Sequence, residues 1–87
     1  MKKEEMEKRM VEDLSYRKEW MIKSAESELK CVQKYFEELK EAKDDYEIIN
    51  KSRAFSQMVQ NLAAQVNGGY EEIEKIRLGL YYLENLD

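Results

Sequence analysis

The chain has 87 residues and a formal net charge of −4, with one cysteine and no histidine. The lack of histidine removes the commonest general base and zinc ligand, and a lone thiol excludes an intrachain disulfide framework. The acidic balance argues against non-specific binding to nucleic acid. With no proline and only three glycines, the sequence predicts long helices. We expect no cofactor and no metal. No window approaches the ~18 apolar residues of a membrane span, so we expect no membrane contact. The single cysteine fits a reducing compartment, so we expect a cytoplasmic protein.

The first predicted helix runs from about residue 2 to about residue 43, because no residue in this range breaks a helix. Its apolar residues recur at spacings of three, four and seven, which places them on one face. Between Ile22 and Leu39 the spacing alternates between three and four, the pattern of a coiled-coil seam. The members of this predicted seam are Ile22, Ala25, Leu29, Val32, Phe36 and Leu39.

A turn is predicted between residues 44 and 52. Asp44 and Glu47 have the spacing of a capping box, in which two side chains satisfy free amides at the start of a helix. The apolar face also changes phase here, since a new seam begins at Ile48 and continues through Ser52. A continuous helix that kinks near residue 47 is the alternative.

The stretch from Ala54 to Tyr70 contains no charged residue, so we expect its helix to touch other helices on more than one face. The segment Asn-Gly-Gly at 67–69 is predicted to end that helix, because glycine readily adopts the left-handed conformation that closes one. The predicted second and third helices cover residues 46–66 and 70–86. The expected centre of the core consists of Leu29, Phe36, Phe55, Val59, Leu62, Val66, Ile73 and Leu80.

These elements predict an all-α, single helical domain over residues 1–87, a coiled-coil-like three-helix bundle of one long N-terminal helix and two shorter ones. Two short helices reach only about half of the long one, so the apolar stripe in its first half lacks cover, unless the helix breaks near residue 15. A twofold pairing would bury that stripe, so we expect a homodimer, with a different protein as the alternative partner. The predicted interface residues are Met6, Met10, Leu14, Tyr16, Trp20 and Met21.

Two other features have simple interpretations. We expect the acidic side chains near the end of the first helix to be solvated. The alternative is that they make an electrostatic contact with a basic partner. Cys31 lies off the predicted seam and has no histidine to activate it, so we expect an inert thiol. The acidic residues concerned are Glu37, Glu38, Glu41, Asp44 and Asp45.

No group of residues in the sequence has the arrangement of a catalytic centre, so we expect no enzyme activity. The sequence favours a small helical protein-binding module, a dimeric regulator or inhibitor of a protein partner of the kind that phages direct against host enzymes. The alternative is a nucleic-acid-associated accessory factor that uses the first helix. The basic residues available for that alternative are Lys2, Lys3, Lys8, Arg9, Arg17, Lys18 and Lys23.

Overall fold

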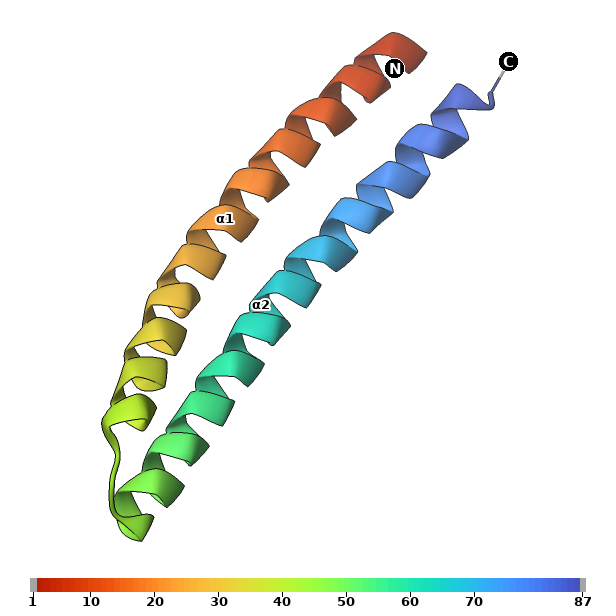
Figure 1. Ribbon diagram of the computed structural model, residues 1–87. Helices are drawn as coiled ribbons and strands as arrows, with labels where there is room; N and C mark the ends of the chain where they lie inside the picture. Colours follow the sequence, from red (N-terminus) through yellow and green to blue (C-terminus); the bar gives the residue numbers. More distant parts are fainter. Residues whose placement is uncertain (1, 87) are drawn as a thin grey trace.

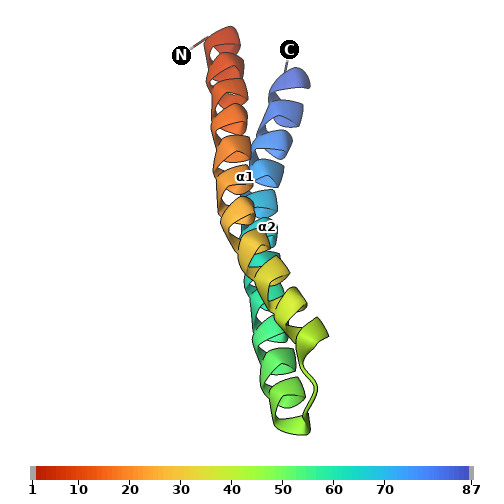
Figure 2. The same cartoon turned by 60° about the vertical axis from the view of Figure 1, so that its left-hand side comes forward.

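The computed structural model describes residues 2–86 as two long antiparallel helices joined by a short turn (Figure 1). Helix α1 spans Lys3–Glu41 and helix α2 spans Asp45–Glu84. The described residues are 93% helical and contain no strand, so the all-α prediction is confirmed. The hairpin measures 66 × 17 × 14 Å. Figure 2 shows the helices crossing at a shallow angle, as in a coiled coil.

Neither helix contains, within residues 2–86, a stretch both long enough and apolar enough to cross a membrane. At the open end of the hairpin, the Lys3 ammonium donates a hydrogen bond to the Leu86 carbonyl oxygen at 3.2 Å. The beginning of α1 therefore lies beside the end of α2.

The first turn lies just before and at the start of the segment 44–52 in which the sequence predicts it, and that segment is helical from Asp45 onward. Ala42, Lys43 and Asp44 connect the helices, and the Asp44 carboxylate accepts a hydrogen bond from the Glu47 amide at 2.8 Å. In return, the Glu47 carboxylate accepts one from the Lys43 amide at 3.4 Å. These bonds satisfy amides that have no partner inside a helix, so the capping residues fix where α2 begins. The alternative of a continuous kinked helix is wrong.

The break predicted at residues 67–69 is also wrong, because α2 runs through it as one helix. Neither Gly68 nor Gly69 has a positive φ. An interior glycine costs a helix only about 1 kcal/mol relative to alanine, and the packing surface continues in phase across this point. The contact residues Leu62, Gly69 and Ile76 follow one another at intervals of seven. The chain is therefore a two-helix hairpin and not a three-helix bundle.

The surface of α1 that contacts α2 also differs from the predicted seam. Half-buried residues mark it at spacings of three and four: Glu7, Met10, Leu14, Arg17, Met21, Ser24, Glu28, Cys31, Tyr35 and Glu38. The predicted seam lies beside this surface, since Ile22, Leu29 and Phe36 each follow one of its members by one position. One position is about 100° around the helix.

The hairpin has very little interior. Among the described residues, only Leu83, at 4% relative exposure, and Gly69 are buried. Leu29, Phe36 and Val59, which are predicted core residues, are exposed. The other predicted core residues are half-buried: Phe55, Leu62, Val66, Ile73 and Leu80. The predicted core is therefore wrong as a description of one chain, because two helices can cover only one stripe of each other.

Two adjacent glycines provide a matched test of the packing in α2. A Cβ atom at Gly68 would meet nothing within 4 Å, so Gly68→Ala should stabilise the protein by about 0.5–1 kcal/mol through helix propensity alone. A Cβ atom at Gly69 would lie 3.1 Å from Cγ and 3.3 Å from Cβ of Met21. Gly69→Ala should therefore gain nothing or destabilise. Urea unfolding followed by circular dichroism measures both, and equal gains would contradict the close approach at Gly69.

The cap at the turn can be tested with a conservative control. Asp44→Ala removes the acceptor for the Glu47 amide and should cost about 1 kcal/mol of unfolding free energy. Asp44→Asn keeps an acceptor oxygen at the same place and should cost much less. Thermal or urea unfolding of the two variants beside the parent measures the difference. An equal loss in both variants would show that the charge, and not the cap, is what matters.

Candidate functional site: an apolar face of the hairpin

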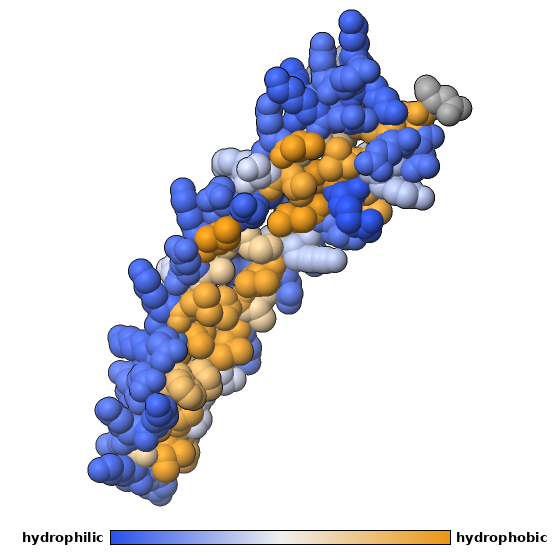
Figure 3. Space-filling model, turned by 45° about the horizontal axis from the view of Figure 1, so that its top comes forward, coloured by the Kyte–Doolittle hydropathy of each residue, from blue (hydrophilic) through white to orange (hydrophobic). Residues whose placement is uncertain are grey.

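One side of the hairpin carries a band of apolar side chains that runs along most of its length (Figure 3). Both helices contribute to it, because the rings of Phe36 in α1 and Phe55 in α2 lie 5.7 Å apart at the boundary between the helices. We call this band the apolar face. Its members are Val11, Ile22, Ala25, Leu29, Val32, Phe36 and Leu39 of α1 and Ile48, Phe55, Val59, Leu62, Val66, Ile73 and Leu80 of α2.

The apolar face exists because each helix has two neighbouring apolar stripes. On α1, Met10, Leu14 and Met21 point to α2, while Ile22 and Leu29 lie about 100° further round. A helix that is apolar over so wide a sector cannot bury all of it against one neighbour. The second stripe of each helix therefore lies on the same open side of the hairpin.

The degree of exposure is what makes this face a candidate site. Val11 is 55% exposed and Leu29 is 51% exposed. Ile22, Phe36, Ile48 and Val59 are also exposed, and the other members of the face are half-buried. Burial of a large apolar side chain is worth about 1.5–3 kcal/mol, so a row of them in water leaves a large unused free energy. Contiguous apolar patches of this kind are typical of interaction surfaces.

A hollow of about 420 Å³ lies on this face near the open end of the hairpin. Leu14, Ser15, Lys18 and Val11 of α1 line it together with Ile73 of α2. Its lining is mostly aliphatic, with one hydroxyl and one ammonium among the five side chains. Such a hollow suits a bulky apolar side chain better than a polar small molecule.

The predicted interface residues do not lie together. Met10 and Met21 pack against Gly79 and Gly69 of α2, each with an atom 3.1 Å from where a glycine Cβ would be. Met6 and Leu14 are half-buried, the latter in the hollow. The premise that no helix reaches this stripe is wrong, because α2 is a single helix of 40 residues.

The two predicted aromatic contacts are exposed on the other side of α1. Tyr16 is 64% exposed and Trp20 is 46% exposed. Trp20 precedes Ile22 by two positions, about 200° around the helix, so it points away from the apolar face. These two side chains are the part of the predicted interface that stays available for a partner.

The acidic cluster is used locally around the turn. Glu38 forms an ion pair with Lys51 across the helices at 3.7 Å, and Glu37 pairs with Lys40 at 3.5 Å. Asp44 caps α2, the Asp45 carboxylate accepts from the following amide, and Glu41 is exposed. Among residues 2–86, no three acidic, cysteine or histidine side chains gather closely enough to hold a metal ion.

The remaining candidates are also dispersed. Arg17 lies 3.6 Å from Asp13 one turn earlier, which lowers the local positive charge of the first helix. Cys31 is a free, half-buried thiol on the surface that contacts α2. Neither feature forms a cluster with chemical reactivity of its own.

An ion pair on α2 shifts two pKa values near the open end. Arg77 donates hydrogen bonds to Oε1 of Glu74, and the bond from its Nε measures 2.8 Å. These bonds, followed by the charge of Arg77 and a hydrogen bond from Tyr70, lower the pKa of Glu74. The same bond to Glu74 raises the pKa of Arg77. Both groups are therefore charged over the whole physiological range.

Comparison with known proteins adds no relative: no family model, curated protein or solved structure matches the chain.

The pKa of Glu74 gives a pH prediction. A carboxyl whose pKa is lower in the folded state stabilises that state above its ordinary pKa, and this contribution is lost as the pH falls through the lowered value. Arg77→Gln should therefore raise the pKa of Glu74 towards its ordinary value. Lys75→Gln is the control, because Lys75 pairs with Glu72. A carbon-detected NMR titration measures Glu74 directly, and an unchanged pKa in Arg77→Gln would reject this cause.

Proposed function

We propose that the chain is a non-enzymatic helical protein-binding module, a regulator or inhibitor of a protein partner, and that the apolar face is its binding surface. The observation that carries this proposal is the row of exposed apolar side chains along one side of the hairpin (Figure 3). The row crosses from α1 to α2 at the Phe36–Phe55 contact, so the two helices present one surface and not two separate stripes.

The shape of this surface favours a helical partner. Two helices side by side leave a shallow groove between them, and a third helix laid along such a groove buries residues at i, i+3, i+4 and i+7. The exposed residues Ile22, Leu29 and Phe36 repeat every seven positions, the spacing that a partner helix would match. The hollow beside Leu14 and Ile73 offers one deeper pocket for an anchoring side chain.

Tyr16 and Trp20 supply a second contact in this proposal. They are exposed on α1 away from the apolar face, and aromatic side chains of this type are frequent anchors in interfaces. A module with an apolar face on one side and an aromatic pair on another can hold two proteins at once. This arrangement suits a regulator better than an isolated enzyme.

The proposal predicts where protein contacts form in the cell. A photo-reactive amino acid in place of Leu29 should give protein adducts, because this position is 51% exposed within the apolar face. The same group in place of Ser27 is the matched control, because Ser27 is exposed about 200° away on the same helix. Leu29→Asp should abolish adduct formation from a photo-reactive group at Val59. Equal yields at positions 27 and 29, or none at 29, would reject the apolar face as the binding surface.

A further inference from the structure

We propose that the apolar face is occupied by a second copy of this chain, in an antiparallel four-helix arrangement. In it α1 packs on α1 of the second copy, α2 packs on α2, and the two turns lie at opposite ends. This inference rests on the proposed use of the apolar face as a binding surface and names its occupant. The observations that carry it are the size of the face, the charges along its two edges and the position of the hollow.

The size of the face is sufficient for a stable pair. The hairpin is 66 Å long and 17 Å wide, so one face has a footprint on the order of 1,000 Å², compared with about 800 Å² per partner in a standard interface. Apolar side chains extend along it from Ile48 near the turn to Val11 near the open end. A partner of equal length and equal apolar pattern covers all of it, and a second copy has both properties.

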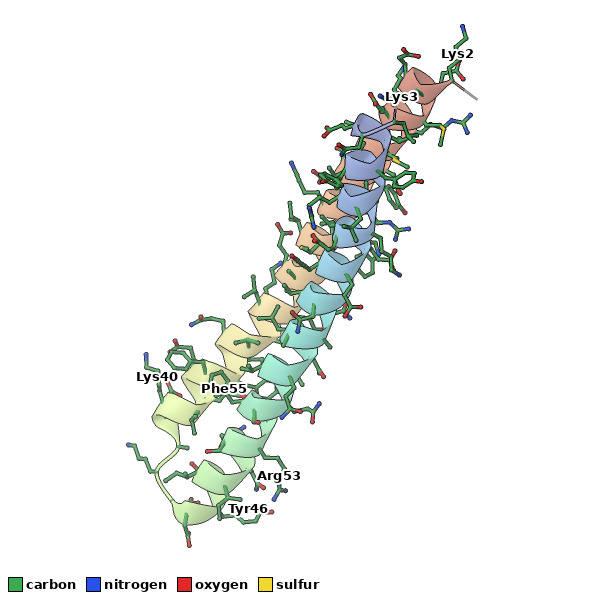
Figure 4. The ribbon with its side chains drawn as sticks, turned by 90° about the vertical axis from the view of Figure 1, so that its right-hand side faces the viewer. Lys2, Lys3, Lys40, Tyr46, Arg53 and Phe55 are labelled. Atoms are coloured by element: carbon green, nitrogen blue, oxygen red, sulfur yellow. The ribbon has the colours of Figure 1, made fainter. Side chains whose placement is uncertain are left out.

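The outer edge of α2 carries charges of opposite sign at its two ends. Arg53, Gln60, Asn67 and Glu74 follow one another at intervals of seven, and each comes one position after an apolar-face residue or, for Arg53, after Ser52. They therefore lie on the outer side of α2, away from α1, where Figure 4 shows Arg53. When two such edges run antiparallel, Gln60 comes level with Asn67 of the second copy, and Arg53 comes level with its Glu74, whose carboxylate is bound by Arg77 of the same chain.

The outer edge of α1 has the same property at its ends. Glu12, Glu19, Glu26, Gln33 and Lys40 follow one another at intervals of seven. An antiparallel mate places Glu12 beside Lys40 of the second copy, and Glu19 beside Gln33. Lys40 lies on the outer side of α1, where Figure 4 shows it.

Both edges independently place the twofold axis at the same height on the hairpin. The midpoint between Glu12 and Lys40 is residue 26, and the midpoint between Arg53 and Glu74 lies between residues 63 and 64. Met21 contacts Gly69, and five positions further from this contact towards the turn Glu26 lies level with Ala64. One axis therefore serves both helices, as a twofold dimer requires.

The same axis brings an apolar knob to the hollow. A twofold rotation about the level of residue 26 moves Phe36 of the second copy to the height of residue 16, beside the hollow lined by Leu14, Ser15 and Ile73. Phe36 is exposed in the single hairpin. Ala25, close to the axis, is small and lets the two α1 helices approach closely.

The opposite orientation, with both turns at one end, is disfavoured by charge. It would pack α1 on α2 of the second copy at the same height, bringing Lys40 within about one helical turn of Arg53 and Glu19 within about one turn of Glu74. Like charges at such an edge oppose association and help to set the orientation. In the antiparallel arrangement Glu26 lies beside its own symmetry mate, and this like-charge contact provides a test.

The first experiment measures mass and the edge charges. Sedimentation equilibrium of the full chain at micromolar concentration should give twice the chain mass of 10.5 kDa. Glu12→Lys and Lys40→Glu should each weaken the dimer about tenfold, and the double variant should restore it, because the pair is re-formed with reversed sign. Glu26→Gln should tighten the dimer, whereas Glu26→Lys should not, because it keeps a like-charge pair at the axis.

The second experiment locates the axis by cross-linking. In a Cys31→Ser background, Ala25→Cys should form a disulfide between two chains under mild oxidation. Ser27→Cys, on the other side of the helix, should not. Leu29→Asp should prevent both the dimer and the cross-link of the Ala25→Cys variant, while circular dichroism still reports a helical chain.

The outcomes separate this inference from the proposed function. A dimer that shows the charge-swap rescue and the interchain disulfide of the Ala25→Cys variant supports it. A dimer that lacks the charge-swap rescue or the interchain disulfide overturns the arrangement. A dimer that still forms in the Leu29→Asp variant overturns it too. A monomeric chain shows that the second copy is not the occupant. The photo-reactive group at position 29 then tests the proposed function alone. Adducts with another protein support the proposed function, and a lack of adducts rejects the proposed function as well as the dimer.

Discussion

Two helices side by side cannot enclose a core, and this constraint governs the whole structure. Each helix covers one stripe of the other, and everything apolar outside that stripe stays at the surface. In this chain the excluded residues gather on one side, because α1 and α2 each carry their second apolar stripe in the same direction (Figure 3). The helices therefore form their backbone hydrogen bonds, but many apolar side chains stay in contact with water. Association with another surface would remove these side chains from water.

The sequence was sufficient for the all-α class and for the approximate place of the turn. The absence of proline and the capping pair Asp44 and Glu47 are local signals, and local signals fix where helices begin. The predicted helix end at residues 67–69 was wrong because glycine is found in two opposite structural settings. Glycine ends a helix when the chain must turn, but it also appears inside a helix where another side chain comes close, as Met21 does at Gly69. Only the partner surface distinguishes the two cases.

The residues of the candidate site were recognisable in the sequence as apolar stripes, but they were predicted to pack inside the chain. The alternation from Ile22 to Leu39 and the one from Ile48 to Val66 are real apolar stripes, and periodicity alone cannot say which stripe packs inside one chain. The stripe that contacts α2 is harder to recognise, since it includes Glu28 and Glu38 beside Met21. On α1 the mixed stripe packs inside the chain, whereas Ile22, Leu29 and Phe36 of the more uniform stripe stay exposed. The predicted interface followed from an assumed helix length, whereas Met10 and Met21 lie against α2.

The contacts of Met10 and Met21 with Gly79 and Gly69 also make the hairpin vulnerable to oxidants. Each thioether side chain fills a space that glycine leaves open, with atoms 3.1 Å from the place of a Cβ. Conversion to the sulfoxide adds a polar oxygen to a flexible apolar side chain, in a gap that already has little room for a methyl group. Mild peroxide should therefore separate the two helices at these points, and methionine sulfoxide reductases would close them again.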